Sequence, residues 1–405
     1  MNRMRRDRVF GMALAAAGMA AACSRTGTAT ESRPADPPAA AGALAPRLAS
    51  DGDRLALSWV EPDAGGGAAV RFSLWRGGGW SPVQLAARDP RLVKDGADVP
   101  GVVPLPDGSL AAHWTVGRGS SEYARDLFVS ISRDGGATWS APASPHRDGT
   151  VTEHGLATLV PGLSGAPFGI VWLDGRAGEG TAHGEGGTAL YWASWNGGSF
   201  DAEVLIDPRV CDCCKTAAAV AAAGPIVAYR DRGDDERRDI SLSLHVSGDW
   251  SPPVSVREDG WRLTACPTNG PSITARADLV WAAWFSGAGS DPAVRATWST
   301  DGGRTLADAV RVDGGNPSGR VDAAILPDGA AAIVWLERKR DRAEVRVRRA
   351  RPGGSLSEAI VAGETSASRK SGYPRVAAVG GRDVLVAWVE TGEPGRLRAS
   401  VVTLP

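Results

Sequence analysis

The feature that most constrains this chain is an aromatic residue that recurs every 51 to 58 positions. Each of these residues ends a segment with the pattern of a strand, a turn containing glycine and a second strand. A further strand, a glycine-rich turn and a fourth strand follow, as in LFVSISRDGGATWSAP. The predicted unit is therefore a four-stranded antiparallel meander, whose strands are called A to D below. The aromatic residues are Trp59, Trp114, Trp172, Tyr229, Trp284, Trp335 and Trp388.

Seven such units predict an all-β fold, a β-propeller of four-stranded antiparallel blades. Self-similarity at a period of about 40–50 residues is typical of propellers, and ring closure hides the edges of the sheets. The chain has 52 Gly and 27 Pro in 405 residues, which fits many turns and excludes a helical bundle. Most of its 15 Trp are predicted to mark the repeats and to pack between neighbouring blades. A ring of six blades with one irregular repeat is the alternative.

The last repeat ends at Pro405 after strand C and has no recognisable strand D. Either this blade has three strands or an N-terminal strand completes it. Residues 46–405 are predicted to form this single propeller domain.

The residues before the propeller are predicted to be a leader and a tether. Residues 1–8 hold four Arg, residues 9–22 are small and apolar, and Cys23 follows three Ala. This pattern resembles a lipoprotein signal peptide over residues 1–22, cut before an acylated Cys23; an ordinary signal peptide is the alternative. Residues 23–45 then form the lipidated Cys and a flexible linker rich in Ala, Pro, Thr, Ser and Gly. We therefore expect an extracytoplasmic protein anchored to a membrane by its lipid.

The turns between strands C and D carry a recurrent motif. Residues 132–139 read SRDGGATW and fit S-x-D-x-G-x-T-W throughout, and residues 299–306 read STDGGRTL and fit all but the last position. Asp in a tight turn accepts nearby backbone N–H groups, and Gly adopts positive φ. The motif resembles the Asp box, or BNR repeat, of sialidases and related β-propellers. The resemblance implies a structural role, on the face away from the active site, for Ser132, Asp134, Gly136, Thr138, Trp139, Ser299, Asp301, Gly303 and Thr305.

The resemblance to sialidases covers most of residues 46–405 as an architecture, but the catalytic pattern departs from that family. Where the family has Arg-Ile-Pro at an early strand A, this chain has Asp98 followed by Val-Pro. An Arg there clamps a substrate carboxylate, whereas Asp98 repels one. The second Arg of the family has no counterpart. Arg320 lies where the third would be, and Tyr373 lies about where the nucleophilic Tyr is found. The resemblance thus implies a sialidase-like scaffold with a degenerate catalytic set.

A polar face is predicted where strands A begin and strands B end, opposite the C–D turns. Clustered charges at one end of a rigid ring form the expected ligand site. If the chain is an enzyme, two axial carboxylates act as acid and base on a glycoside. The candidate catalytic residues are Asp98, Glu153, Asp174, Asp231, Arg320 and Tyr373. The candidate binding residues are His154, Arg176, Arg230, Asn269 and Glu337.

Four Cys besides Cys23 all lie at the starts of strand A in the fourth and fifth repeats: Cys211, Cys213, Cys214 and Cys266. An even number of Cys outside the cytoplasm predicts disulfides. Of the three connectivities, we prefer Cys211–Cys214 with Cys213–Cys266, because a Cys213–Cys214 bond would strain the backbone. The alternative is a thiolate site for a soft metal such as Cu(I) or Zn, with His154 as a further ligand. Because CDCC does not match a standard zinc spacing, no metal is predicted.

These patterns favour a binding protein, a tethered propeller that presents its axial face to a glycan or to an extracytoplasmic protein partner. A sialidase-like exo-glycosidase is the alternative, and soft-metal binding at the Cys cluster is a third. The net charge of −1 gives no electrostatic case for nucleic acid. Serine-hydrolase and nucleotide-binding glycine motifs are absent from the sequence. No cofactor is predicted, and the expected state is a monomer.

Overall fold

The computed structural model describes residues 32–121, 123–180 and 187–405. The predicted signal peptide and Cys23 lie outside these residues. The described chain is almost entirely β, with two short 3₁₀ turns, η1 (Arg176–Gly178) and η2 (Arg369–Ser371). In this part of the chain, no helix has the length and apolar character that crossing a membrane requires.

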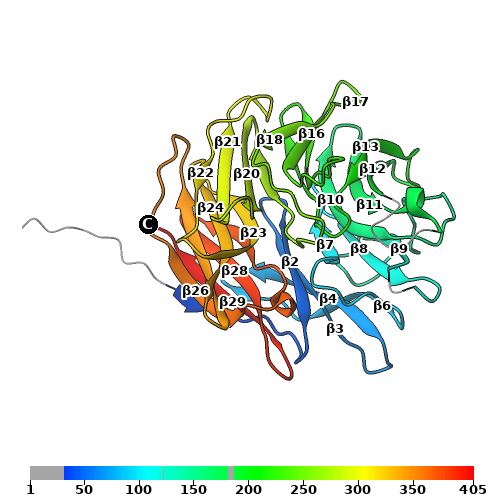
Figure 1. The fold of residues 1–405 in the computed structure, drawn as a ribbon. Helices are drawn as coiled ribbons and strands as arrows, with labels where there is room; N and C mark the ends of the chain where they lie inside the picture. Colours follow the sequence, from blue (N-terminus) through cyan, green and yellow to red (C-terminus); the bar gives the residue numbers. More distant parts are fainter. Residues whose placement is uncertain (1–31, 122, 181–186) are drawn as a thin grey trace, which may run out of the picture.

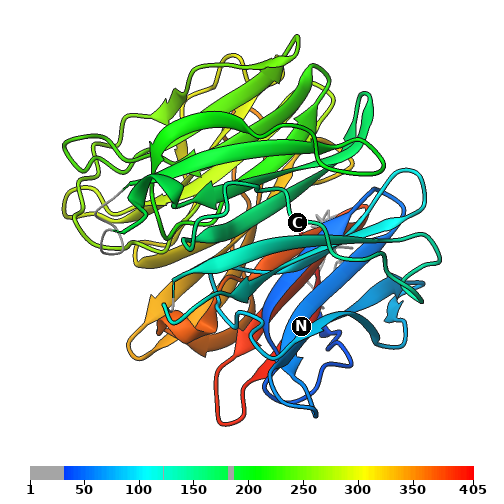
Figure 2. The ribbon, with the colours of Figure 1, turned by 90° about the vertical axis from the view of Figure 1, so that its right-hand side faces the viewer.

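The strands form seven separate sheets around a common axis, which confirms the predicted propeller of seven blades (Figures 1 and 2). Blades one to three contain β2 (Leu44–Ser50), β3 (Leu55–Pro62), β4 (Ala68–Arg76), β5 (Gly79–Trp80) and β6 (Gln84–Asp89); β7 (Gly101–Pro104), β8 (Leu110–Gly117) and β9 (Arg125–Ser132); and β10 (His154–Leu163), β11 (Ala166–Asp174), β12 (Thr188–Trp195) and β13 (Val204–Val210). Blades four and five contain β14 (Ala217–Ala221), β15 (Gly224–Arg230), β16 (Ile240–Val246), β17 (Asp249–Trp250) and β18 (Val254–Arg257); and β19 (Ser272–Arg276), β20 (Leu279–Ser286), β21 (Ala293–Ser299) and β22 (Val310–Arg311). Blades six and seven contain β23 (Pro317–Ile325), β24 (Ala331–Lys339), β25 (Arg342–Ala350) and β26 (Ile360–Ser366); and β27 (Arg375–Gly380), β28 (Asp383–Glu390), β29 (Arg396–Thr403) and β1 (Ser32–Pro34).

Strand D is the least regular element of the blades. In blades one and four it is split in two, because β5 and β6 both pair with β4, and β17 and β18 both pair with β16. Blade two departs from the predicted four strands, since only a single bridge between Val129 and Ala143 follows β9. Pro142 and Pro145 flank that bridge. Because proline has no N–H to donate, a longer ladder does not form there.

Blade seven is completed by the N-terminal strand. β1 pairs antiparallel with β29, with Ser32 opposite Val402 and Pro34 opposite Ser400. In Figure 1, β1 is the dark blue arrow that lies against the red strands. The ring therefore begins about a dozen residues earlier than the predicted boundary at residue 46, within the stretch expected to be a linker. The pairing covers the free edge of β29, which composition alone did not indicate.

The periodic aromatic residues fill the seams between blades, as predicted. Trp59, Trp172, Trp284 and Trp335 are almost completely buried. Trp59 of blade one, for example, packs with Leu385 and Ala387 of blade seven. These contacts join the first and last blades and make the ring one continuous core.

The two complete C–D turn motifs have the same hydrogen-bond arrangement. Asp134 Oδ1 accepts the backbone N–H of Thr138 at 2.9 Å, and its Oδ2 accepts the Thr138 hydroxyl at 2.6 Å. Asp301 and Thr305 repeat both contacts at 2.9 and 2.6 Å. At Gly136, φ is +100° and a Cβ would lie 2.4 Å from the Phe72 ring, so this position requires glycine.

Candidate functional site

A cavity of 720 Å³ follows the axis of the ring, and all seven blades contribute to its wall. Its lining comes from the innermost strands, β2, β10, β14, β19, β23 and β27, and from the segment around β7. Much of the wall is small and apolar. The alanines that line it are Ala49, Ala97, Ala157, Ala217, Ala218, Ala275, Ala323, Ala324, Ala377 and Ala378.

Three cations lie among these small residues, Arg47 on β2, Lys215 just before β14 and Arg375 on β27. Arg47 Nη1 donates to Ala157 O at 3.4 Å, and Arg375 Nε donates to Pro46 O at 2.9 Å. Lys215 Nζ donates to the carbonyl of Pro271. Among the described residues, none of the three has a carboxylate within ion-pair distance. The cavity thus contains positive charge that the protein does not neutralise by direct pairing.

Among the described residues that line the cavity, Asp322 is the only carboxylate away from the mouth. It accepts hydrogen bonds from uncharged groups. Its Oδ1 accepts the Ser272 hydroxyl at 3.0 Å, and its Oδ2 accepts the backbone N–H of Val376 at 3.2 Å. The other lining carboxylate, Asp51, is at the A–B turn and is bound to Arg54 at 2.7 Å. One carboxylate therefore faces three cations.

Burial and mutual repulsion lower the pKa values of the basic groups. Desolvation, followed by the charge of Arg375, lowers the pKa of Arg47 to about 10. The same two causes lower the pKa of Lys215 to about 7. His113, whose ring lies beside Arg47 across Gly101, has a pKa well below its usual value for the corresponding reasons, burial and then Arg47. Such shifts mark a site that is poised for a negative group.

Toward the strand A starts, the cavity is lined by buried side chains, among them Ala97 and Leu156, which pack with Tyr373. At the A–B turns its lining residues, including Gly52, Pro106 and Arg276, are exposed. The mouth therefore lies on the same face as the C–D turns, opposite the face on which the sequence predicted a polar site.

The predicted carboxylates at the ends of strands B bind the seam tryptophans. Trp172 Nε1 donates to Asp174 Oδ2 at 2.8 Å, and Trp335 Nε1 donates to Glu337 Oε2 at 2.7 Å. Trp59 and Glu61 make the same contact at 2.9 Å. A Trp-x-carboxylate pattern at the end of strand B thus supplies the buried indole with its acceptor.

Asp98 and Glu153 belong to a buried ion cluster between blades two and three. Asp98 Oδ2 accepts from Arg125 Nη1 at 3.0 Å and from the Thr115 hydroxyl at 2.8 Å, and its Oδ1 accepts the backbone N–H of Leu156. Glu153 Oε1 is 3.5 Å from Arg125 Nη2. Desolvation raises the pKa of Glu153 to about 8 against the pull of Arg125. Neither carboxylate lines the axial cavity.

His154 and Arg176 lie in a second cluster, formed by the loop before β10 and the end of β11. His154 Nε2 is 3.0 Å from Asp148 Oδ2, and its ring stacks on His146 with a centroid distance of 3.8 Å. Arg176 binds Asp174 at 2.6 Å and approaches Asp148 at 3.3 Å. The carboxylates and histidines are close enough to hold a metal ion, but Arg176 already supplies a positive charge to both carboxylates. His154 is thus part of this cluster, and the alternative that joins it to the cysteines is not formed.

The remaining predicted residues stabilise the loops at the strand A starts. Arg230 donates to the carbonyls of Asn269 and Phe285 at 2.8 and 2.7 Å and lies over the Trp261 ring. Asn269 Oδ1 accepts the backbone N–H of Arg320 at 2.7 Å.

Arg320 itself binds the carbonyls of Ser368, Arg369 and Gly372. Asp231 accepts the Ser241 hydroxyl at 3.0 Å. These side chains satisfy backbone groups of the loops that hold them.

Tyr373 packs with Ala97 and Leu156, which line the cavity. It is 2% exposed, its hydroxyl donates to Thr268 O at 2.8 Å, and it accepts from the backbone N–H of Gly270 at 3.3 Å. Lys215 Nζ is 5.2 Å from the centroid of its ring. Burial raises the pKa of Tyr373, so the phenol is a packed, hydrogen-bonded side chain.

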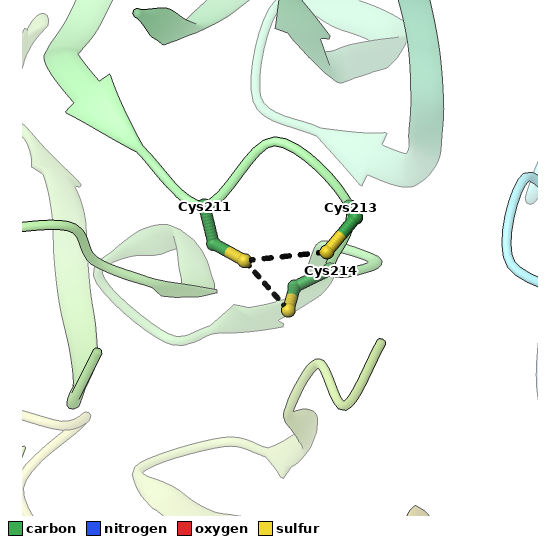
Figure 3. Close-up of side chains that lie close together, drawn as sticks. All are labelled: Cys211, Cys213 and Cys214. Atoms are coloured by element: carbon green, nitrogen blue, oxygen red, sulfur yellow. Dashed lines mark hydrogen bonds between the residues drawn. The ribbon is translucent and has the colours of Figure 1, made fainter. Parts of the chain in front are cut away.

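The cysteines form one covalent bridge and one thiol pair. The predicted Cys213–Cys266 disulfide is present and joins blades four and five. In place of the second predicted disulfide, Cys211 and Cys214 are thiols whose sulfurs lie 2.8 Å apart and share a hydrogen bond (Figure 3). Arg230 and Arg238 lie beside this pair, and positive charge stabilises a thiolate.

The cation cluster escaped the sequence prediction because its members are about 160 residues apart and share no local motif. A signal was nevertheless present. Residues 46–49 read PRLA and residues 374–377 read PRVA, so the first and last repeats place Arg at the same position of strand A. Lys215 occupies a comparable position in the fourth repeat, before the small residues of β14.

Comparison with known proteins supports the fold. No family model matches this chain, and no curated protein matches it. Among solved structures it is similar to a protein of unknown function from Dyadobacter fermentans, with 17% identity, a TM-score of 0.55 and coverage of 93% of this chain and 98% of the other. It is also similar to a PL25 ulvan lyase bound to -[GlcA(1-4)Rha3S]-, with 12% identity, a TM-score of 0.56 and coverage of 91% and 95%. The endosialidase of phage phi92 matches at 11% identity and a TM-score of 0.50, covering 93% of this chain and 69% of that one.

Proposed function

We propose that this protein binds an acidic glycan, through a carboxylate or sulfate group seated among Arg47, Lys215 and Arg375. The observation that carries the proposal is the unpaired positive charge in the axial cavity. A buried cation without a partner costs several kcal/mol. An anionic group that enters the cavity removes this cost and gains charge-assisted hydrogen bonds.

The dimensions of the cavity also fit a small ligand group. Its 720 Å³ lies within the range of roughly 300–1,000 Å³ that is usual for small-molecule sites. Its mouth at the A–B turns admits a chain end, and its apolar alanine wall suits the faces of sugar rings. Proteins of this fold that act on glycans include the lyase bound to GlcA and Rha3S units, which agrees with an acidic glycan as ligand.

A hydrolase with two axial carboxylates is the weaker candidate. The carboxylates suggested for such chemistry bind Trp, Arg or backbone groups, and Asp322 is alone at the buried end of the described lining. A general acid and a general base on opposite sides of a glycoside need two carboxylates that face the same substrate. Binding without hydrolysis is therefore the function we favour.

The test is a comparison of glycans that differ in charge. Calorimetry with uronate-containing, sulfated, sialylated and neutral oligosaccharides should give saturable binding to acidic members only. In Arg375→Met, each lost hydrogen bond to a charged group removes about 1.5–3 kcal/mol, which corresponds to about 10- to 100-fold weaker binding. Arg342→Met is the matched control, because Arg342 is exposed on the rim and pairs with Glu364. Equal binding of neutral and acidic glycans, or unchanged binding in Arg375→Met, contradicts the proposal.

We also propose that Cys23 carries the lipid that anchors the protein outside the cytoplasm. The basic start, the apolar segment and the three Ala before Cys23 support this. Cys23→Ser should move the protein from the membrane fraction to the soluble fraction. Membrane retention of that variant, or a lack of incorporated fatty acid in the native protein, contradicts the anchor.

A further inference from the structure

The thiols of Cys211 and Cys214 lie in a cationic and deeply buried environment. The two residues are 1% and 2% exposed. The backbone N–H of Cys211 donates to Arg230 O at 2.9 Å, which places it beside that residue. The second arginine, Arg238, is 2% exposed; its Nη2 pairs with Glu236 at 2.7 Å, and its Nη1 lies 3.8 Å from Asp212. Positive charge beside a thiol favours the thiolate, which is the nucleophilic form.

The pKa values of the two thiols, Cys211 and Cys214, are shifted in opposite directions. Burial opposes ionisation of Cys214, but the hydrogen bond from Cys211 and the charge of Arg230 together lower its pKa. Burial and the neighbouring Cys214 raise the pKa of Cys211. Burial opposes the charge of Arg238, but Cys211 and then Glu236 raise its pKa overall. Cys214 is therefore the more readily ionised of the two sulfurs, and its thiolate is placed to take the proton of Cys211.

The Cys213–Cys266 disulfide lies within reach of this thiolate. Cys211 Sγ is 3.8 Å from Cys213 Sγ, and the three sulfurs of Cys211, Cys213 and Cys214 all lie within 4.8 Å of one another (Figure 3). Cys213 and Cys266 are both partly exposed. The cluster therefore joins a buried dithiol to a more accessible disulfide.

We propose that these four cysteines form an intramolecular thiol–disulfide exchange site. In the first step, Cys211 transfers its proton to Cys214 and attacks Cys213 Sγ; a Cys211–Cys213 bond forms, and Cys266 leaves as a thiolate. In the second step, the proton passes from Cys214 to the Cys266 thiolate, Cys214 attacks Cys211 Sγ, and Cys213 leaves as a thiolate. One disulfide and two thiols are present before and after, so no external oxidant or reductant is required.

The exchange moves the free thiols from a buried position to an accessible one. It also removes the covalent tie on residues 266–271, which hold the hydrogen-bond partners of Tyr373. This segment keeps its hydrogen bonds, since Thr268 O and Gly270 N bind Tyr373, Asn269 O binds Arg230, and Cys266 O binds Arg369. We therefore expect a local loosening of the segment while the ring stays intact.

The test is trapping of thiols in the full chain, folded and without reductant. N-ethylmaleimide is added, samples are taken over time, and non-reduced peptides are mapped by mass spectrometry. The expected product has label on Cys213 and Cys266 and a bridge between Cys211 and Cys214. Label on Cys211 and Cys214 with Cys213–Cys266 intact overturns the proposal, and so does a chain with two disulfides and no label.

Two variants separate the steps. Cys211→Ser removes the attacking sulfur, so Cys266 labelling should fall to background. Cys214→Ser removes the sulfur that the second step needs and the acceptor of the Cys211 proton, so label should accumulate on Cys266 with a Cys211–Cys213 bridge, more slowly than in the native chain. Circular dichroism and thermal unfolding establish that both variants fold. Labelling of Cys266 in Cys211→Ser at the native rate would rule out exchange through Cys211.

Discussion

Replacing Lys215 with methionine should make the unliganded protein more stable. Lys215 is 6% exposed, and burial and the charge of Arg375 lower its pKa from 10.5 to about 7. At about 1.4 kcal/mol per pKa unit, the lowered pKa means that burial of Lys215 destabilises the native state by about 5 kcal/mol at pH 7. Met has a similar length and no charge.

The losses that oppose this gain are smaller. Lys215→Met removes the hydrogen bond to Pro271 O, which contributes about 1 kcal/mol, and the contact with the Tyr373 ring, which contributes up to about 1 kcal/mol. The net stabilisation is about 3 kcal/mol by this reasoning. In a chain of this size it raises Tm by about 3–6 °C. Acidic glycan binding should weaken in the same variant, because stability and binding place opposite demands on this cation.

The dependence on pH has a defined sign. The native state releases the Lys215 proton above about pH 7, whereas the unfolded chain holds it up to its ordinary pKa of 10.5. The unfolded state therefore binds more protons between these values, and the stability of the native protein rises with pH across this window. The advantage of Lys215→Met should shrink from pH 7 upward and vanish near pH 10.

Urea unfolding followed by Trp fluorescence at pH 7, 8, 9 and 10 measures both effects. Lys339→Met is the matched control, since Lys339 is exposed at the end of β24 and its replacement should change stability by less than about 0.5 kcal/mol. A Lys215→Met variant that is less stable at pH 7, or that differs from the native protein by the same amount at every pH, refutes the reasoning.

Three further predictions concern the ring itself. Glu337→Ala should lower the free energy of unfolding by about 3–5 kcal/mol in urea titrations, because it leaves the Trp335 indole and two backbone N–H groups without their acceptor. Glycan affinity should stay unchanged, and a loss of affinity at native stability would contradict this structural role. Gly169→Ala should cost about 1–3 kcal/mol by calorimetry, since its Cβ would lie 2.0 Å from the Trp192 ring, and native stability would show that the seam can adapt. Removal of residues 32–36 should lower Tm and promote aggregation in light scattering, because the edge of β29 becomes exposed; an unchanged monomer would mean that blade seven is stable with three strands.

Most of the fold could be predicted from the sequence because the same structural unit repeats along the chain. Each blade restates the same order of strands, turn glycines and a seam aromatic, so seven weak signals add up to one strong one. Closure by β1 was one of two alternatives for the last blade, and the local composition of residues 32–34 did not decide between them. Pairing with β29 is a contact between the two ends of the chain, which no local window contains.

The candidate site was harder to predict because a charged side chain at a strand end can either bind a ligand or stabilise the fold. Glu337 and Asp174 look like ligands in sequence, but each accepts a hydrogen bond from a Trp two residues earlier. Arg47 and Arg375 look like ordinary strand residues, but the ring brings them together at the axis. The disulfide followed from cysteine number and geometry, whereas the thiol pair lies beside arginines that only the folded chain places there.

The pairing of Ser32 with Val402 also sets an order of events in time. These residues are joined by nearly the whole chain, so their contact has the longest sequence separation that the fold allows. During synthesis, six blades can form one after another as their repeats emerge, but the seventh must wait until β29 has emerged. Until then the seams that border it have no partner, and the growing ring exposes apolar surface on both sides of the gap. The chain is therefore most dependent on protection from aggregation just before β29 emerges.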